Sequence, residues 1–322
     1  MDLRRGLQAF YDAHGYAAPR QFVSEFVHLA SGYEADVYAY TLESESSREE
    51  LVLRLFRGAE ASAKPQREYE AMSSLRVAEY PVPCPSTLQS SNEALGSPFL
   101  VMERVQGHSL ENNFWAGDAT QRAEVHALHA RLMAQLHAIE AGSILPHSPL
   151  LKRQDPFASF DTELAGLYQQ FQRLEVDRWP SLTECLHWVE ARRESAASKQ
   201  LSVIHGDFHR NNILIRDSDK EPVVIDWSNI RLADYRFDLG WSRVIALLIN
   251  RLSGLPDSEL ISLETYAQFS GKLAEHIELF EVMGCLRILF DALFSQNRGR
   301  ETGCVIGILK ERNELPLGDL EE

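Results

Sequence analysis

The sequence predicts an α+β protein in which a small antiparallel β-sheet lobe precedes a larger, mainly helical lobe. Residues 26–56 and 99–102 contain short apolar runs separated by polar turns, which is typical of paired strands. Residues 121–139 and 241–252 carry apolar side chains at helical spacing. At 322 residues, the chain also exceeds the usual size of a single hydrophobic core. We expect residues 1–104 to form the first lobe and residues 105–322 the second.

The first lobe is expected to contain three consecutive strands. Residues 26–30 read as a strand, 36–42 as the returning strand and 51–56 as a third strand, with polar connections between them. Ser31 and Gly32 lie in the first turn, where backbone N–H groups can contact phosphates. One glycine also fits an ordinary hairpin turn, so both interpretations stay open.

The third strand, LVLRLF, carries one charged side chain among apolar neighbours. A charge in this setting needs a partner, because an unpaired charge is costly to bury. The helix expected to begin near Pro65 offers Glu68 and Glu70, and helical spacing places Glu68 next to its inward-facing stripe. That stripe is expected to consist of Tyr69, Met72 and Leu75. We therefore predict that Arg54 pairs with Glu68.

Residues 203–240 contain the most informative pattern in the chain. The pattern H-x-D-x-x-x-x-N places His205, Asp207 and Asn212 in one loop. Two apolar runs around a polar turn then predict a β-hairpin that carries Asp226 back toward Asn212. A carboxylate near an acceptor hydroxyl, with two oxygen ligands for Mg²⁺, is what phosphoryl transfer requires. The spacing therefore predicts a catalytic loop followed by a metal-binding strand end.

The second lobe is expected to bury helical stripes. The first stripe consists of Val125, Leu128, Leu132, Leu136 and Ile139, and a later one of Trp241, Val244, Ile245, Leu248 and Leu252. Four acidic residues in this lobe can meet a positively charged acceptor, although solvated surface is the expected place for each. They are Asp161, Glu163, Glu281 and Asp291.

Composition excludes several classes of protein. The net charge is −15, from 32 basic and 47 acidic residues, which argues against a nucleic-acid partner. The four cysteines show no metal-binding or redox spacing, and no apolar run is long enough to span a membrane. We therefore expect a cytoplasmic protein with no membrane partner. An acidic surface can attract a cationic acceptor, although it usually serves solubility.

Three segments resemble the aminoglycoside phosphotransferase and choline kinase group of small-molecule kinases. They are HGDFHRNNIL at 205–214, VIDW at 224–227 and RFDLGW at 236–241. The resemblance implies the bilobal protein-kinase-like fold. It also implies transfer of the γ-phosphoryl group of ATP or GTP, with Mg²⁺, to a hydroxyl group of a small molecule such as an aminoglycoside, an amino alcohol or a sugar-like metabolite. A monomer or a homodimer fits this group.

The same resemblance implies roles for the loop residues. Asp207 is expected to be the catalytic base, and Asn212 and Asp226 the Mg²⁺ ligands. Asp238 is expected to brace the catalytic loop, with the N-cap of the following helix as the alternative. His205 is expected to support the loop through packing and hydrogen bonds.

The resemblance also places the nucleotide in the first lobe. Arg54, with Glu68, is expected to hold the phosphates where protein kinases use lysine. The purine edge is expected to meet the backbone of Met102, Glu103 and Arg104, at the start of the linker between lobes. The apolar walls are expected to be Val37, Leu214 and Ile225.

Two alternatives to a small-molecule kinase stay open. The first is a nucleotide-binding pseudokinase or interaction module, which the single glycine of the phosphate loop and the arginine at position 54 favour. The second is a divalent-metal hydrolase whose cluster consists of His205, Asp207, His209 and Asp226. The hydrolase leaves Asn212 without a role.

Overall fold

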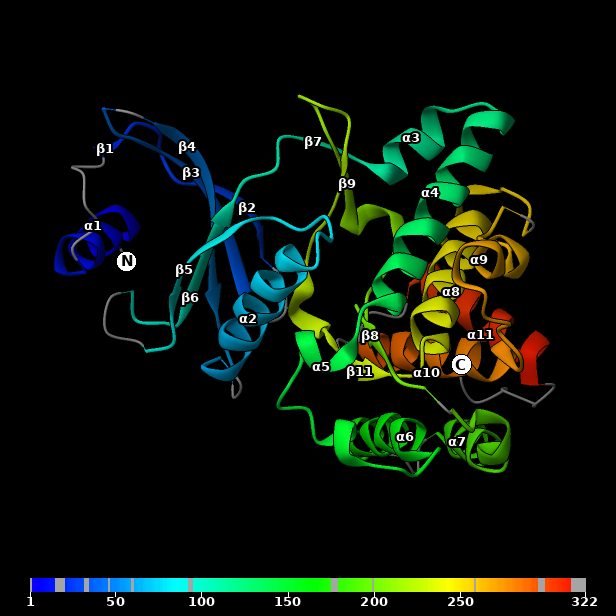
Figure 1. The fold of residues 1–322 in the computed structure, drawn as a ribbon. Helices are drawn as coiled ribbons and strands as arrows, with labels where there is room; N and C mark the ends of the chain where they lie inside the picture. The colour runs from blue at the N-terminus through cyan, green and yellow to red at the C-terminus, as the bar shows by residue number, and fades with distance from the viewer. Residues whose placement is uncertain are drawn as a thin grey trace. The chain divides into compact units, whose positions relative to one another are not determined.

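The chain folds into two compact units. The first comprises Met1–Ser109 and Ile213–Ser228, and the second Leu110–Asn212 and Asn229–Glu322. Figure 1 shows that the first unit is rich in strands and the second is mainly helical, which confirms the predicted α+β class. The structure is a computed structural model that describes residues 2–14, 21–31, 35–45, 47–58, 61–91, 95–174, 179–198, 200–257, 259–294 and 299–313.

An antiparallel sheet forms the centre of the first unit. Its strands are β1 (Gln21–Phe22), β2 (Val27–Ser31), β3 (Ala35–Glu43), β4 (Arg48–Phe56), β5 (Pro85–Gln89) and β6 (Phe99–Glu103). They pair in the order β1-β3-β4-β6-β5, and β2 also pairs with β3. The three strands expected from the apolar runs at 26–56 are β2, β3 and β4, so the local alternation of side chains was sufficient to find them.

The two faces of this sheet carry side chains of different character. Leu51, Leu53 and Leu55 of β4 point to one face, where helix α1 (Leu3–Ala13) packs with Leu7 and Phe10 in a shared apolar core. Each fully buried leucine of this kind stabilises the fold by about 2 kcal/mol. The alternate residue Arg54 necessarily points to the opposite face.

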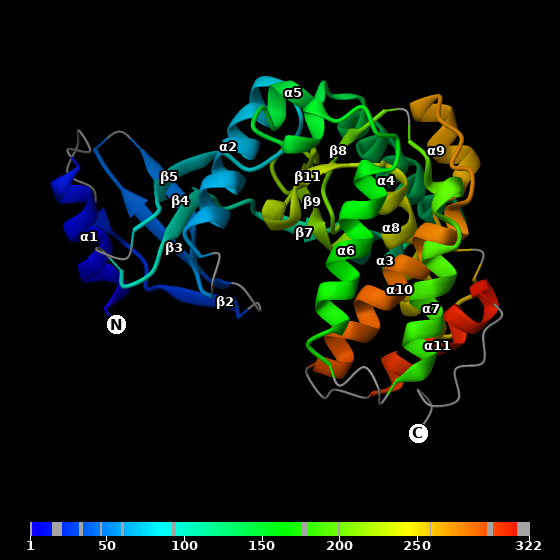
Figure 2. The same cartoon turned by 90° about the horizontal axis from the view of Figure 1, so that it is seen from below.

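Helix α2 (Ala63–Val77) packs against β5 and β6, and Figures 1 and 2 show it and α1 on different sides of the sheet. Its buried stripe includes Glu68 itself, whereas Tyr69 is only half-buried and Glu70 is exposed. Tyr69 was therefore wrongly expected in this stripe. The buried stripe consists of Pro65, Glu68, Ala71, Met72 and Leu75.

A small second sheet explains why residues 213–228 belong to the first unit. The predicted hairpin is formed by β9 (Ile213–Arg216) and β10 (Pro222–Val224), with Ile213 opposite Val224. The strand β7 (Gly107–Ser109) pairs with the other edge of β9. A Cβ at Gly107 would lie 2.2 Å from the carbonyl oxygen of Ile215, so only glycine permits this approach.

The second unit is built from helices and one short strand pair. The helices are α3 (Leu110–Ala116), α4 (Ala119–Ala138), α5 (Ala141–Ile144), α6 (Ala158–Phe171), α7 (Pro180–Glu190), α8 (Arg236–Ser253), α9 (Leu263–Ser270), α10 (Ile277–Phe294) and α11 (Arg300–Asn313). Strands β8 (Ser202–Ile204) and β11 (Arg231–Ala233) pair antiparallel. Among the described helices, none is both long and apolar enough to cross a membrane.

Helix α10 lies at the centre of this unit. It contacts α6, α7, α8 and α11, and Figure 2 shows α6 and α7 running beside it. Because α10 is surrounded, its apolar residues continue around the helix and even Glu281 is buried. Glu281 is ion-paired with Arg243 and Arg312, at 2.7 and 2.6 Å. The surface position expected for Glu281 is therefore wrong.

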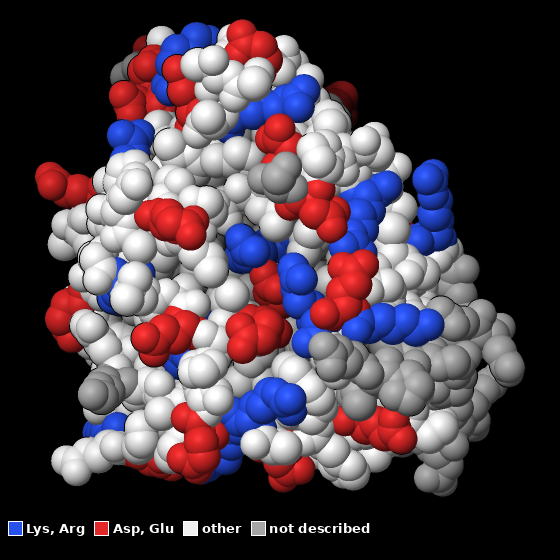
Figure 3. Space-filling view, turned by 90° about the vertical axis from the view of Figure 1, so that its right-hand side faces the viewer, with Lys and Arg blue, Asp and Glu red and all other residues white. Residues whose placement is uncertain are grey.

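Charges on the surface are mixed in sign. On the face shown in Figure 3, acidic and basic side chains are interspersed. One exposed network joins Arg251 to both Asp257 and Glu311 at 2.6 Å. Surface pairs of this kind contribute little to stability individually.

Candidate active site

The H-x-D motif lies in a loop of the second unit between β8 and the short 3₁₀ helix η4 (Arg210–Asn212). The His205 side chain is buried, and its Nδ1 accepts a hydrogen bond from the backbone N–H of Asp207 at 3.2 Å. Its ring packs edge-on against Phe208. His205 therefore shapes the loop through packing and hydrogen bonding.

Asp238 holds the same loop from the helix behind it. Its two carboxylate oxygens accept hydrogen bonds from the backbone N–H groups of His205 and Gly206, each at 2.7 Å, and His137 Nε2 lies 3.2 Å away. Gly206 has φ +80°, a conformation that favours glycine. Burial raises the pKa of Asp238, but the hydrogen bond and charge of His137 outweigh it and lower the pKa.

The alternative role for Asp238, as an N-cap, is wrong. Helix α8 begins at Arg236, and Tyr235 occupies the N-cap position. Asp238 is therefore inside the first turn, where its carboxylate also benefits from the positive end of the helix dipole. Its side chain is fully buried, so its two backbone partners in the loop are held without competition from water.

Asp207 is held by three neighbours in the second unit. The indole N–H of Trp241 donates to Oδ1 at 2.7 Å, and His209 Nε2 lies 3.4 Å from the same oxygen. The side-chain amide of Asn212 donates to the Asp207 carbonyl oxygen at 2.9 Å and to Oδ2 at 3.3 Å. Both carboxylate oxygens are therefore oriented, while the side chain keeps 23% of its exposure.

The electrostatic setting keeps Asp207 ionised. Burial acts to raise its pKa, but the hydrogen bond and charge of His209 and the positive charge of Arg287 together hold the pKa well below its usual range. At neutral pH this carboxylate can therefore accept a hydrogen bond or a proton and cannot donate one.

Asn212 has one polar atom left after these contacts. Its amide nitrogen is directed at Asp207, so its amide oxygen is the atom that can face a cation. Within the described residues, no hydrogen bond to that oxygen is present. An amide oxygen is a suitable ligand for Mg²⁺.

The first unit holds the second candidate ligand. Asp226 follows β10 and has φ +64°, a strained conformation for an aspartate. Its Oδ1 accepts hydrogen bonds from both terminal nitrogens of Arg54 at 3.1 Å and from Ser228 Oγ at 3.0 Å. Arg54 Nη1 also donates to Glu68 Oε1 at 2.6 Å, and Glu68 is only 1% exposed. Arg54 therefore joins the buried Glu68 to Asp226. The pairing of Arg54 with Glu68 is the one that the sequence predicts.

The phosphate loop lies largely outside the described residues. Ser31 is the last residue of β2, and Gly32 is not among the described residues. The role expected for these two residues therefore stays a prediction.

Backbone groups at the end of β6 are partly engaged. The N–H of Glu103 donates to the Cys84 carbonyl oxygen at 2.8 Å, and the N–H of Arg104 donates to the Glu50 carbonyl oxygen at 2.9 Å. Met102 is buried in the sheet between β4 and β5. A purine bound at this segment would therefore need other donors. The expected apolar walls, Val37, Leu214 and Ile225, are half-buried.

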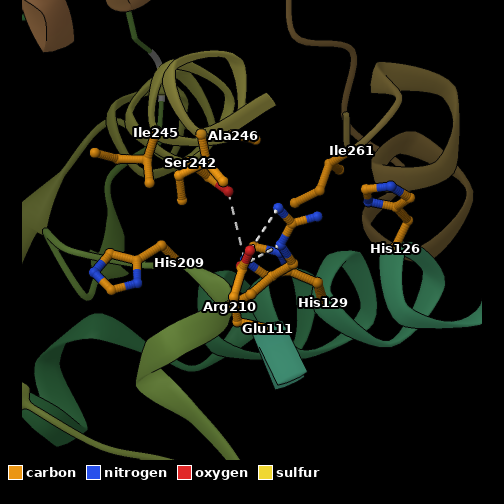
Figure 4. A pocket seen from close by; sticks show the side chains of 10 residues that line it. Glu111, His126, His129, His209, Arg210, Ser242, Ile245, Ala246 and Ile261 are labelled. Carbon is orange, nitrogen blue, oxygen red and sulfur yellow. Dashed lines mark hydrogen bonds and ion pairs between the residues drawn. The ribbon is translucent and has the colours of Figure 1, made fainter. Parts of the chain in front are cut away.

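A small cavity lies behind the catalytic loop (Figure 4). Arg210 donates to Glu111 at 2.7 Å, and the other polar residues of the lining are His126, His129, His209 and Ser242. Its volume of about 10 Å³ is close to the minimum that one water needs. Burial, and then the charge of Arg210, lower the pKa of His126 to about 4. The cavity therefore suits a bridging water, and the Arg210–Glu111 pair ties η4 to α3.

Comparison with known families agrees with this geometry. Residues 25–281 match the model of a family described as the phosphotransferase enzyme family. The chain belongs to this family. The family expected from the three sequence segments is thereby confirmed, and the match covers both the Arg54–Asp226 group and the Asp207 loop of the chain.

Curated relatives of this chain are longer proteins. It is 24% identical to human acyl-CoA dehydrogenase family member 11 over 212 residues, which covers 61% of the chain and 26% of the relative. It is 21% identical to mouse acyl-CoA dehydrogenase family member 10 over 179 residues, which covers 55% of the chain and 16% of the relative. The chain thus spans about a quarter or less of these relatives.

Solved structures share the fold over nearly the whole length. A putative aminoglycoside phosphotransferase from Ralstonia eutropha has a TM-score of 0.65 and 18% identity, with 98% of this chain and 96% of that chain covered. Plasmodium vivax ethanolamine kinase has a TM-score of 0.60 and 13% identity, with 91% and 82% covered. At these identities the likeness establishes the fold alone, and the expected kinase-like fold is confirmed.

Most of the acidic residues that could meet a positively charged acceptor are already paired with arginines. Asp161 makes two hydrogen bonds to Arg193 at 2.7 and 2.6 Å, and Glu163 pairs with Arg231. Glu281 is buried between two arginines, as described above. Three of the four carboxylates therefore have a guanidinium partner already.

Proposed function

We propose that this chain is a small-molecule kinase that transfers the γ-phosphoryl group of ATP or GTP to a hydroxyl group of its acceptor, with Mg²⁺. The observation that carries this proposal is the Asp207 carboxylate, which is ionised, oriented by Trp241 and held in a loop braced by Asp238. The match to the phosphotransferase enzyme family supports the same reaction class.

In the proposed reaction, the acceptor hydroxyl donates a hydrogen bond to Asp207. The hydroxyl oxygen forms a bond to the γ-phosphorus, the bond from that phosphorus to the β,γ-bridging oxygen breaks, and the nucleoside diphosphate leaves. The proton passes to Asp207. A carboxylate of low pKa is a weak base, but phosphoryl transfer passes through a loose transition state that needs an oriented hydroxyl more than a strong base.

Asn212 and Asp226 are the residues that we propose to hold Mg²⁺. Their amide and carboxylate oxygens are hard ligands of the type that this ion prefers. Asp226 keeps a strained backbone that the hydrogen bonds from Arg54 and Ser228 help to maintain, which is typical of functional positions. A bound Mg²⁺ would neutralise charge on the phosphates during transfer.

The first unit is proposed to bind the nucleotide. Arg54, fixed by Glu68, would contact phosphate oxygens, Ser31 and Gly32 would lie over them, and the backbone at 102–104 would meet the base. A related structure was solved as a GDP complex and another with ADP bound, so adenine and guanine nucleotides both fit the proposal.

The acceptor is proposed to be a dissolved small molecule, phosphorylated in the cytoplasm by a monomer or homodimer. The net charge of −15 supports the absence of a nucleic-acid partner.

The test compares Asp207→Asn with Asp217→Asn, a hairpin-turn aspartate that is 62% exposed. With Mg²⁺-ATP and a panel of hydroxyl compounds, we expect Asp207→Asn to lower kcat by about 10²- to 10⁴-fold, the range for losing a general base. The control should keep full turnover. Unchanged turnover in Asp207→Asn would refute the mechanism.

The alternatives predict other results in the same assay. A pseudokinase would gain thermal stability from Mg²⁺-ATP while phosphorylating no acceptor. A metal hydrolase would release phosphate from esters without added nucleotide. Among the described residues, no three histidine, cysteine or carboxylate side chains are grouped so that they could hold a metal ion.

A further inference from the structure

A chain of contacts within the second unit links an arginine of α10 to the proposed base. Arg287 Nη1 donates to the carbonyl oxygen of Gly206 at 2.6 Å, and its guanidinium carbon lies 4.1 Å from the centre of the Trp241 ring. The indole N–H of Trp241 in turn donates to Asp207. Arg287 and Asp207 therefore contact the same tryptophan, Arg287 over the face of its ring and Asp207 at its indole nitrogen.

Arg287 differs from other buried or half-buried arginines of this unit in how its positive charge is paired. Arg210, Arg231, Arg236 and Arg243 each have a carboxylate partner within 3 Å. Within the part of the chain that the structure describes, Arg287 has no carboxylate within the 4.0 Å of an ion pair. Its side chain is half-buried, so a positive charge is held next to the catalytic loop with only a carbonyl and an aromatic ring as close partners.

The electrostatics of Arg287 agree with this geometry. Burial, followed by the charge of Arg231, lowers the pKa of Arg287, while Asp207, Asp291 and Glu163 act in the opposite direction without cancelling it. A guanidinium remains charged under all these conditions, so the site stays cationic. An anion bound next to Arg287 would compensate this positive charge.

Negative charge on this side of the loop is largely cancelled. Glu163 is paired with Arg231, and Glu281 with Arg243 and Arg312. Asp291, one helical turn beyond Arg287, has a pKa that burial raises and that the charge of Asp207 raises further, although Arg287 opposes this. Within the described residues, an ammonium group near Asp207 would therefore meet Glu163 and Glu281 already paired with arginines.

We propose that the acceptor is an anionic alcohol, whose carboxylate or phosphate group is bound by Arg287 while its hydroxyl group meets Asp207. Stacking on Trp241 fixes the plane of the guanidinium, and one terminal nitrogen is used by Gly206, which leaves donors for a carboxylate or phosphate group. Because both groups contact the same indole, a short acceptor can reach both. This proposal rests on the proposed kinase function and names the substrate class of its site.

The test uses probes that share a three-carbon skeleton and differ in charge. They are glycerol, D-glycerate, glycerol 3-phosphate and 3-amino-1,2-propanediol. Binding is measured without nucleotide by ligand-observed NMR, and phosphorylation is measured with Mg²⁺-ATP. Arg287→Gln removes the charge, Arg287→Lys keeps it, and Arg192→Gln is the matched control, since Arg192 also stacks on a tryptophan, Trp188, at 3.7 Å.

We expect the wild type to bind one or both anionic probes in preference to glycerol and the amino alcohol, with the better of the two identifying carboxylate or phosphate as the anion. Arg287→Gln should weaken that binding by about 10- to 100-fold, the cost of losing a hydrogen bond to a charged group. Arg287→Lys should recover part of it, and Arg192→Gln should leave it unchanged. The KM for the anionic acceptor should rise more than kcat falls.

Preferred binding of the amino alcohol or of glycerol would overturn the proposal, as would failure of both anions to bind. An equal loss of kcat for every acceptor, with anion binding intact, would show that Arg287 is only a counterion of Asp207. Anion binding that depends on Arg287 without phosphorylation of any acceptor would keep the site and refute the kinase function. A melting temperature near that of the wild type shows that each variant is folded.

Discussion

Replacing Asp238 by asparagine should uncouple helix α8 from the catalytic loop. The carboxylate accepts two backbone N–H groups at 2.7 Å, one on each oxygen, and it is fully buried. Asparagine has one oxygen, so its amide group would turn a donor toward either His205 N–H or Gly206 N–H. The variant therefore loses a hydrogen bond to a charge, and one buried backbone N–H is left without an acceptor.

Each of these losses costs about 1 to 3 kcal/mol, and they overlap, so we expect Asp238→Asn to lower the free energy of unfolding by about 2 to 5 kcal/mol. That is a large part of the ~5 to 15 kcal/mol that stabilises a typical domain. Urea unfolding of both proteins measures the difference through the midpoint, provided that the slope is unchanged. Turnover should also fall, because the loop that carries Asp207 loses its support.

The pH dependence gives this prediction a second check. The pKa of Asp238 is lower in the folded protein than the ordinary value of 3.8, so its stabilisation is complete above pH 3.8 and is lost as the pH falls through the folded pKa. The stability difference between wild type and Asp238→Asn should therefore be constant near neutrality and shrink in acid. Asp257→Asn, at a half-exposed pair with Arg251, is the control and should cost at most about 1 kcal/mol. A difference between wild type and Asp238→Asn below about 1 kcal/mol would contradict this account.

Two further predictions concern the nucleotide side and the base. Arg54→Lys keeps the charge but loses the fork that joins Glu68 to Asp226, so we expect kcat/KM for ATP to fall by about tenfold or more, measured at saturating acceptor. An unchanged kcat/KM would show that the fork is dispensable. His209→Gln removes the strongest influence that lowers the pKa of Asp207 against its burial, so the acid limb of kcat/KM should move to higher pH. A pH profile identical to that of the wild type would rule out this role.

The sequence predicted those parts of the candidate site whose residues also form a local pattern. The alternation in β4 and the helical spacing of α2 were enough to pair Arg54 with Glu68, because both elements have one clearly apolar face. The hairpin of β9 and β10 followed from two apolar runs around a polar turn. Each of these features depends on residues within about one or two helical turns or in adjacent strands. A local sequence pattern can therefore predict them.

Other parts depend on contacts between distant residues, and no local pattern predicts them. Glu111 and Arg210 are 99 residues apart, and each taken alone resembles an ordinary surface charge. Arg287 and Trp241 meet only because α10 packs against α8. Glu281 was expected on the surface because a charge in a helix normally faces water, but α10 is enclosed by its neighbours. Tertiary packing therefore determined which charges became buried partners.

The division of the chain has a consequence for the order of its synthesis. The first unit is completed by β9 and β10, and β9 pairs with β7 across more than a hundred residues of the second unit. A ribosome that has finished residue 109 has therefore made the main sheet and β7 but not the strand that pairs with β7. Until residue 216 emerges, the hydrogen-bonding edge of β7 lacks this partner. The first unit therefore cannot finish folding before residues 110–212 of the second unit have been made, and cutting the chain between residues 110 and 212 yields no fragment that contains either unit whole.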